Sequence, residues 1–418
     1  MVTRHALVVW HRWVGLAMAA FLVIAGFTGA IIAFQDELDA WLNPHLYQAL
    51  SQPGQPMLDV YQLQAQAQQQ APANTRVDEL QFKLPQSTLE DHHAEAVIFR
   101  LTPVDPQASI PADQLFINPQ SGKVLGSRLS TAGPFQRETL LPFLYKLHYS
   151  LALPGVSGRL IMGIVAVLWT LDTFVAFFLT LPRRQPQSKS SYWQRWKPAW
   201  LVKWQASGTR INFDLHRAVG LWLCSILLVF AWSSVMFNLR EQVYLPIMTK
   251  LMPFDLSWRS IPKLPQPLTS LPMPWPQAHQ LAQQAMQGFA KNHQLQIDYE
   301  DRLRLDRERG VYQYFVHSSA DLRQDRGNTA IAIDAYTGEI KGHWLPTQDQ
   351  SGNTFSNWLG ALHMGQVFGM PYRIFVCVTG LSLVMISVTG VLIWSRKRAG
   401  KSRVTLRAPQ PANTLQRY

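Results

Sequence analysis

Four long runs with almost no charge constrain the fold of this chain more than any other feature. Three of them contain no charged residue: Trp13 to Gln35, Ala218 to Leu239 and Ile374 to Ser395. The fourth, Leu160 to Pro182, carries only Asp172. A helix needs about 20 predominantly apolar residues to cross a bilayer. The sequence therefore predicts four transmembrane helices, and it excludes a soluble enzyme, a collagen-like chain and a disordered chain.

The basic residues predict how these helices are oriented. The formal net charge is +12, and sixteen of the 38 Lys and Arg residues lie in three segments that contain no Asp or Glu: residues 1–12, 182–211 and the tail after Ser395. Cytoplasmic segments of membrane proteins carry such an excess. We expect both termini and the Trp-rich 182–211 loop in the cytoplasm, with the loop on the membrane surface. The topology accounts for the charge, so no nucleic-acid partner is expected.

The second half of the chain repeats the first in the same order. Both halves therefore contain a span, an external domain and a returning span, and such parallel repeats are related by an axis along the membrane normal. The matching segments are Trp10–Leu16 with Leu215–Leu221, Leu115–Gly126 with Ile331–Gly342, and Leu147-His148 with Leu362-His363.

The external segments are too long for simple loops, so each is expected to be a small α+β domain. A polar helix comes first in each, and strands with alternating polarity follow. An Asn/Asp-x-x-Ser/Thr-Gly hairpin then needs a left-handed glycine, at Gly122 and at Gly338. The predicted helices are Val60–Gln70 and Gln277–Asn292, and the clearest predicted strands are Val97–Leu101 and Val311–Val316.

The predicted fold class is a membrane protein with four transmembrane helices, arranged as a parallel duplicated pair, and two external α+β domains. Its predicted parts follow in chain order. They are the N-terminus and first span (1–36), the first external domain with the His148 segment (37–155), the second span (156–182), the basic loop (183–211), the third span (212–239), the second external domain with the His363 segment (240–370), the fourth span (371–395) and the basic tail (396–418).

Four of the twelve histidines occupy repeat-equivalent positions at the membrane edges. His11 and His216 are expected inside, and His148 and His363 outside. Facing imidazoles can supply the two axial ligands of a haem iron, whose other four positions the macrocycle fills. The pattern predicts one haem near each membrane face. Zinc is a weaker candidate because it prefers four tetrahedral ligands, often including Cys.

Residues next to the inner histidines fit the same interpretation. Gly15 and Gly220 lie one helical turn after them, where a missing side chain lets a flat ring approach the backbone. Arg12 and Arg217 could pair with haem propionates. Plainer interpretations stay open: glycines that pack helices, arginines that only mark the cytoplasmic side, and histidines that only anchor the interface.

Two further features bear on these sites. Pro154 and Pro371 follow the outer histidines, so each of these histidines is expected on a short interfacial helix before its span. Asp172 is an acid inside a span, and the repeat pairs it with Ser387. Such a carboxyl relays a proton or orients a ligand, or it is only hydrogen-bonded locally.

The HR-x-x-G opening of a span, the external hairpin and the Leu-His before a returning span, each used twice, resemble the PepSY-associated transmembrane helix family over about residues 5–398. That family includes iron-regulated inner-membrane proteins and dihaem siderophore-iron reductases of Gram-negative bacteria. The resemblance implies a multi-pass inner-membrane protein with two periplasmic PepSY-like domains. It also implies two haem b groups per chain, held by His11, His216, His148 and His363.

By this resemblance the activity is that of a ferric-siderophore reductase. The haems pass electrons across the membrane to a periplasmic ferric siderophore, and Fe(II) is released for uptake. No catalytic residue beyond the haem ligands is expected. Some relatives carry a fused flavin module, but no expected cytoplasmic segment here exceeds about 30 residues, so no bound flavin is expected. The electron donor is then a membrane quinol or a cytoplasmic reductase.

Two alternatives remain beside the reductase. PepSY-type domains also serve as binding or regulatory modules, and the spans would then only anchor them. In that case, replacing His148 and His363 by Ala would leave function intact. A siderophore permease is the second alternative, although four spans make a thin pathway.

Overall fold

The computed structural model of the chain describes residues 3–50, 55–84, 93–185, 187, 189–323 and 326–406. The chain forms two compact units. One, here called the helix unit, comprises Met1–Ala30, His148–Asn238 and Cys377–Tyr418. The other, the sheet unit, comprises Ile31–Leu147 and Leu239–Val376. The end of the predicted basic tail, from residue 407, lies outside the described residues.

Long apolar helices form the helix unit. Three of them, α1 (Arg4–Ile32), α6 (Ser157–Thr180) and α14 (Gly369–Leu406), are long and apolar enough to cross a membrane. In place of one straight third span, α8 (Gly208–Trp222) and α9 (Cys224–Asn238) meet at an angle of 70°. The two differ in character, since α8 carries Arg and Asp residues whereas α9 has no charge. The described residues thus contain three such helices, or four if the bent pair is one span.

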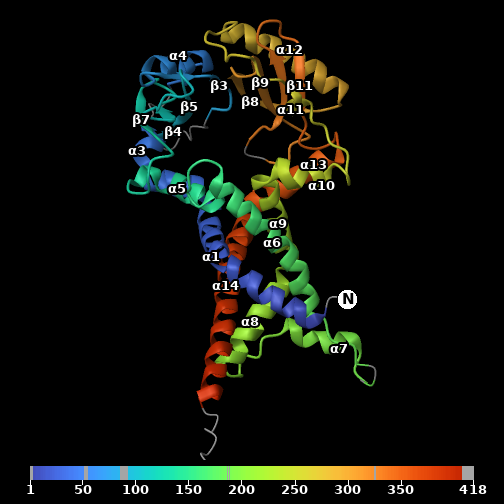
Figure 1. Cartoon of the computed structure of the whole chain (residues 1–418). Helices are drawn as coiled ribbons and strands as arrows, with labels where there is room; N and C mark the ends of the chain where they lie inside the picture. The colour runs from blue at the N-terminus through green and yellow to red at the C-terminus, as the bar shows by residue number, and fades with distance from the viewer. Residues whose placement is uncertain are drawn as a thin grey trace, which may run out of the picture. The chain divides into compact units, whose positions relative to one another are not determined.

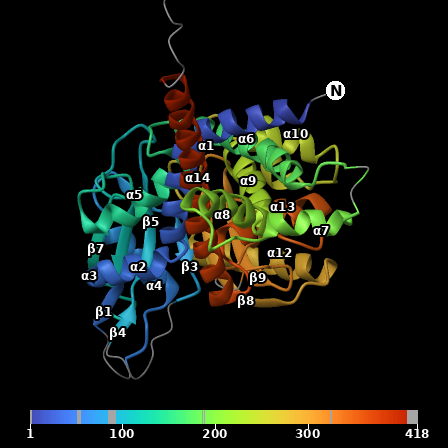
Figure 2. The ribbon, with the colours of Figure 1, turned by 90° about the horizontal axis from the view of Figure 1, so that it is seen from below.

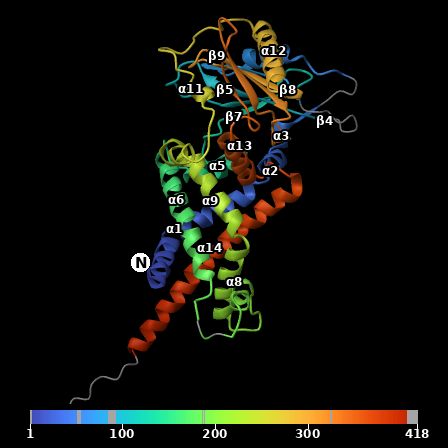
Figure 3. The same ribbon diagram turned by 90° about the vertical axis from the view of Figure 1, so that its right-hand side faces the viewer.

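The four helical segments of this unit share one apolar core. It is built from Met18 and Leu22 on α1, Val165 on α6, Leu227 on α9 and Leu383 on α14. Figures 1 and 3 show α6 and α9 side by side along their length. Burial of these side chains holds together the helices that carry the candidate ligands.

Two glycines allow α1 and α14 to cross in close contact. A Cβ atom on Gly26 would lie 2.7 Å from the Gly380 carbonyl oxygen, and one on Gly380 would lie 2.7 Å from the Gly26 oxygen. Small residues at helix crossings permit this approach in membranes. At the other end of α1, Arg4 donates to the Leu179 carbonyl at 2.6 Å. Because this contact joins the start of α1 to the end of α6, the two helices run in opposite directions.

The sheet unit contains three antiparallel sheets. Their strand orders are β11-β10-β9-β8-β3, β2-β5-β6-β7 and β1-β4. The strands are β1 (Gln48–Leu50), β2 (Thr75–Val77), β3 (Glu79–Gln81), β4 (His93–Glu95), β5 (Val97–Pro103), β6 (Gln114–Ile117), β7 (Val124–Arg128), β8 (Ile297–Asp306), β9 (Val311–Ser318), β10 (Thr329–Asp334) and β11 (Ile340–Trp344).

Helices complete each half of the sheet unit. α4 (Val60–Gln70) packs on the four-stranded sheet through Leu63 and Ala67. α12 (Trp275–Asn292) covers the five-stranded sheet, as Figure 3 shows. The predicted helices and strands of both domains are therefore present. The remaining helices are α2 (Gln35–Leu42), α3 (Pro44–Tyr47), α5 (Arg137–Ser150), α7 (Tyr192–Trp196), α10 (Leu245–Met248), α11 (Ser257–Ser260) and α13 (Ser351–Met364), with a 3₁₀ turn at Lys197–Trp200 and a π turn at Arg240–Tyr244.

One strand of the first half belongs to the sheet of the second half. β3 pairs with β8 in the register Glu79↔Arg304, Leu80↔Leu303 and Gln81↔Arg302. The two strands lie beside each other in Figure 2. Leu80 is fully buried in the same apolar core as Leu303. The two α+β domains, predicted separately, are thus joined by a shared sheet.

The two repeated hairpins have the predicted conformation. Asn118 Oδ1 accepts hydrogen bonds from the backbone N–H groups of the following turn, and Asp334 Oδ1 does the same in the second half. Gly122 has a φ of 68° and Gly338 a φ of 77°. The left-handed position that glycine favours is therefore confirmed in both hairpins.

Candidate functional site

The inner histidines lie together in the helix unit. His11 is on α1, His216 is on α8, and their ring centroids are 6.1 Å apart. Two imidazoles that bind one metal ion from opposite sides, with metal–nitrogen bonds of about 2.0 Å, place their ring centroids roughly 6 Å apart. The structure brings this predicted pair to that separation.

A buried carboxylate orients His11. The Nδ1 atom of His11 lies 2.8 Å from Oδ2 of Asp172, which is on α6 and is buried. Because a carboxylate oxygen accepts hydrogen bonds, Nδ1 of His11 is the donor in this contact, and Nε2 is the ring nitrogen that a metal could bind. Oδ1 of Asp172 is buried without a hydrogen-bond partner among the described residues. Of the roles predicted for Asp172, this contact favours orientation of a ligand.

Backbone and threonine oxygens on α14 hold His216. Its Nδ1 donates to the Ile386 carbonyl at 2.9 Å and lies 3.3 Å from Oγ1 of Thr389. The Thr389 hydroxyl donates to the Met385 carbonyl at 2.7 Å, so its oxygen can accept from the histidine. Gly390 leaves room for the imidazole, because a Cβ atom at this position would lie 3.1 Å from Cε1 of His216. We call this set of a carbonyl, a threonine and a glycine the seat of the histidine. Nε2 of His216 is left with its lone pair.

His148 occupies a seat of the same construction on α1. Its Nδ1 donates to the Ala25 carbonyl at 3.0 Å and lies 3.2 Å from Oγ1 of Thr28. A Cβ atom on Gly29 would lie 3.0 Å from Cε1 of His148. Each seat therefore has a carbonyl, a threonine three residues later and a glycine four residues later. The sequence signal for these seats is a Thr-Gly pair inside a predicted span, which our sequence predictions did not include. Two of the three such pairs form the seats, namely Thr28-Gly29 and Thr389-Gly390.

The outer histidines lie on separate short helices, as the prolines predicted. His148 is on α5, which ends before α6 begins, and His363 is on α13, which ends before α14 begins. Gly365 caps α13 with a φ of 70°. His148 belongs to the helix unit and His363 to the sheet unit. The pairing of these two histidines therefore stays a prediction.

The glycines and arginines beside the inner pair differ in their surroundings. A Cβ atom built on Gly15 or Gly220 meets no other atom within 4 Å. Arg12 is exposed. Arg217 donates to Oδ1 of the buried Asp214 at 2.8 Å, so its charge already has a partner. A propionate at Arg217 would have to share the guanidinium with Asp214.

This arrangement fits haem iron at the inner pair. Histidines that bind metals almost always donate their other ring N–H to a carboxylate, a carbonyl or water, which fixes the tautomer and the ring orientation. His11 and His216 both have an acceptor at Nδ1, and His148 has the same arrangement. The open side of each helix at Gly15 and Gly220 can take a flat ring. A haem group held between His11 and His216 would cycle between its ferric and ferrous states and so carry one electron.

Comparison with known proteins identifies the family. The sequence model described as PepSY-associated TM region matches residues 8–397, which is nearly the whole chain. No curated protein matches the sequence. The chain therefore belongs to the PepSY-associated TM region family of membrane proteins.

Proposed function

We propose that the chain is an inner-membrane haem protein that carries electrons to a ferric siderophore in the periplasm. The observation that carries this proposal is the inner pair, in which two histidines with held Nδ1 atoms stand 6.1 Å apart between ring centroids. Structural histidines do not need an acceptor fixed at Nδ1 on both rings of a facing pair. Axial ligands of one iron do.

The chain's residues have distinct roles in this proposal. His11 and His216 hold the inner cofactor, while Asp172 and the Thr389 seat keep their rings from rotating. A hydrogen-bonded carboxylate also makes His11 a stronger donor to the metal, which tunes the reduction potential.

A second haem at His148 and His363 would extend the electron path. His148 lies beside Thr28 of α1, and Thr28 is seventeen residues after His11. At 1.5 Å per residue this corresponds to about 25 Å along a helix, close to the thickness of the hydrocarbon core of a bilayer. His11 and the His148 seat thus lie toward opposite ends of α1, as a transmembrane path requires.

The substrate in this proposal is Fe(III) in a siderophore. Each electron converts one Fe(III) to Fe(II), which oxygen chelators hold far less tightly. The electrons come from a membrane quinol or a cytoplasmic reductase, which docks on the side of the basic 182–211 loop. The three basic segments of the sequence, residues 1–12, 182–211 and the tail after Ser395, support this orientation.

A reoxidation assay tests the proposed activity. The purified protein in detergent is reduced with one equivalent of dithionite per haem and mixed with a ferric trihydroxamate, and a chromogenic Fe(II) chelator follows the product. We expect the reduced haem spectrum to decay as Fe(II) appears. In His216→Ala, the share of the spectral decay and of the Fe(II) that comes from the inner haem should be lost. His317→Gln, in the sheet unit, is the matched control and should behave as wild type. A reduced haem that no ferric siderophore reoxidises would contradict the proposal.

A further inference from the structure

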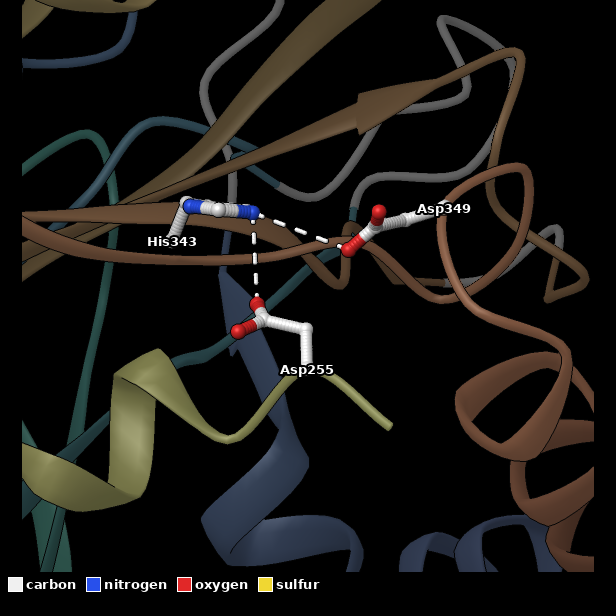
Figure 4. A group of neighbouring side chains, drawn as sticks. All are labelled: Asp255, His343 and Asp349. Atoms are coloured by element: carbon white, nitrogen blue, oxygen red, sulfur yellow. Dashed lines mark ion pairs between the residues drawn. The ribbon is translucent and has the colours of Figure 1, made fainter. Parts of the chain in front are cut away.

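A histidine and two carboxylates from three separate segments meet in the sheet unit. His343 lies on β11, Asp255 precedes α11 and Asp349 precedes α13. Nε2 of His343 is 3.2 Å from Oδ2 of Asp255 and 3.7 Å from Oδ2 of Asp349. Figure 4 shows this one nitrogen facing both carboxylates. These spacings can be compared with those around a metal ion.

The distances suit a single coordinated ion. Nitrogen and oxygen ligands bind transition-metal ions at about 2.0–2.2 Å, so two ligand atoms of one ion lie roughly 3–4 Å apart. One potential ligand atom from each of the three residues lies within 4.8 Å of the other two. A small movement of each side chain is therefore enough to enclose an ion.

The charges of the cluster also favour a cation. Within the described part of the chain, neither Asp255 nor Asp349 forms an ion pair with a Lys or Arg, and each pairs with His343. Two negative charges thus share at most one positive charge. All three side chains are partly buried, with 18–27% of each exposed, so solvent screens the imbalance incompletely. A divalent cation would neutralise it.

Surrounding contacts hold two of the three groups in place. Asp255 accepts hydrogen bonds from the N–H and hydroxyl of Ser257 at 2.8 and 2.9 Å. Its backbone exchanges two hydrogen bonds with the side-chain amide of Asn353, both of 3.0 Å. The His343 ring packs against Phe289, with ring centroids 5.1 Å apart. Such support pre-organises a ligand set before the ion arrives.

We propose that Asp255, His343 and Asp349 form a binding site for a divalent transition-metal ion. One imidazole nitrogen and two carboxylate oxygens suit Fe²⁺, Mn²⁺, Co²⁺ or Zn²⁺. Ca²⁺ and Mg²⁺ prefer all-oxygen sites, so they should bind more weakly. Three protein ligands leave further positions for water or a small ligand. This site is separate from the inner histidine pair, and the inference does not depend on the proposed haem function.

A titration with Co²⁺ tests the site in the full-length protein. Chelator-treated protein in detergent is titrated with Co²⁺ alone, and the visible d–d absorption and the bound metal per chain are measured. We expect wild type to bind one more ion per chain than Asp349→Asn or His343→Gln, whose affinity at this site should fall at least tenfold. An excess of Ca²⁺ should not displace the ion.

The control variant changes a different histidine–carboxylate pair, which has one carboxylate where the proposed site has two. His317 Nδ1 lies 2.6 Å from Oδ2 of Asp298 on the neighbouring strand β8, so Asp298→Asn should leave Co²⁺ binding unchanged. Among the described residues, the Asp349 side chain forms only one other hydrogen bond, from Gln350 at 3.5 Å. The Asp349→Asn variant should therefore unfold at the wild-type temperature without metal, and added metal should raise only the wild-type temperature. Equal Co²⁺ stoichiometry and affinity in wild type, Asp349→Asn and His343→Gln would overturn the proposal.

Discussion

A carboxylate inside an apolar helix is costly unless a partner stabilises it, and Asp172 has such a partner in His11. The same contact leaves one Asp172 oxygen buried without a partner among the described residues. The protein thus keeps a buried carboxylate, despite its desolvation cost, at the position where it orients one imidazole. This is the arrangement expected for a residue that serves the cofactor site more than the fold.

The first prediction concerns this contact. Asp172→Asn keeps the size of the side chain but removes the charge, so His11 loses its carboxylate acceptor. Loss of an orienting partner typically costs 10–100-fold in metal affinity. We therefore expect less haem per chain, or a raised midpoint potential of the remaining haem, in a redox titration. Thr170→Val is the control, because Thr170 lies on the same helix and its hydroxyl bonds the Ala166 carbonyl. Equal haem content and potential in wild type and Asp172→Asn would contradict the assigned role.

The second prediction uses the glycines of the inner site. Leu at Gly15 or Gly220 meets no protein atom at its Cβ position, and it favours the helix by about 0.8 kcal/mol relative to Gly. The fold should therefore tolerate both variants, and a bound ring beside these positions should not. We expect haem content to fall by one per chain while the protein remains folded.

Gly288→Leu gives a matched comparison for the glycine variants. Gly288 lies within α12 of the sheet unit and also has no atom within 4 Å of its Cβ position. It should keep the full haem content. If Gly220→Leu also kept it, the ring would not lie on this side of α8.

At the scale of elements, β3 joins the two halves of the sheet unit. Leu80 at its centre is fully buried, and the Leu305 N–H donates to the Asp78 carbonyl at 2.8 Å just before it. Leu80→Ala should destabilise this pairing by about 2–5 kcal/mol, through lost burial and the cavity left behind. Hydrogen exchange at the Leu305 amide should accelerate by at least about 30-fold.

Leu50→Ala is the control for this prediction. Leu50 ends β1 and is 77% exposed, so its truncation should change stability by no more than about 0.5 kcal/mol. Unchanged exchange at Leu305 in the Leu80→Ala variant would show that β3 contributes little to the five-stranded sheet.

A polar network between α4, α12 and β8 predicts a dependence on pH. His279 Nε2 donates to Glu300 at 2.8 Å, and His279 Nδ1 and the Tyr61 hydroxyl share a hydrogen bond of 2.7 Å. Burial by itself raises the pKa of Glu300, but hydrogen bonds from His279 and Gln283 outweigh it and hold that pKa below its ordinary value of 4.5. Ionised Glu300 therefore stabilises the fold above about pH 4.5, and this contribution is lost as the pH falls through the lowered pKa.

Glu300→Gln should lower the unfolding temperature of the protein at pH 7. The difference from wild type should shrink as the pH falls below about 4.5, because wild type then loses its carboxylate too. Glu308→Gln removes an exposed carboxylate that pairs with Lys263, and it should have no measurable effect. A constant difference between Glu300→Gln and wild type across this pH range would contradict the role of the charge.

At the scale of the whole molecule, the sequence predicted the repeated parts well. Runs with at most one charged residue predicted α1, α6 and α14, and the duplicated hairpins predicted the left-handed Gly122 and Gly338. These features depend on local composition or on one residue type, so a single sequence contains them. The proximity of His11 and His216 was predicted from the repeated sequence segments in which they lie.

Other features depend on contacts between distant segments. The 70° break between α8 and α9 follows no proline, and the pairing of β3 with β8 joins residues more than 200 positions apart. The Asp172–His11 contact and the Asp255, His343 and Asp349 cluster are also long-range. No periodicity in the sequence encodes such contacts. Arg217 shows the same limit, since its partner Asp214 is close in sequence but its burial is set by packing.

The most direct test of the account is the haem content of the whole protein. Protein from haem-replete cells is purified in detergent, its oxidised and reduced spectra are recorded, and the haem is counted per chain in wild type, His216→Ala and His317→Gln. We expect sharp reduced α and β bands at two haems per chain in wild type and His317→Gln, and one haem fewer in His216→Ala. A folded wild-type protein without haem, or a His216→Ala variant with the full count, would contradict it.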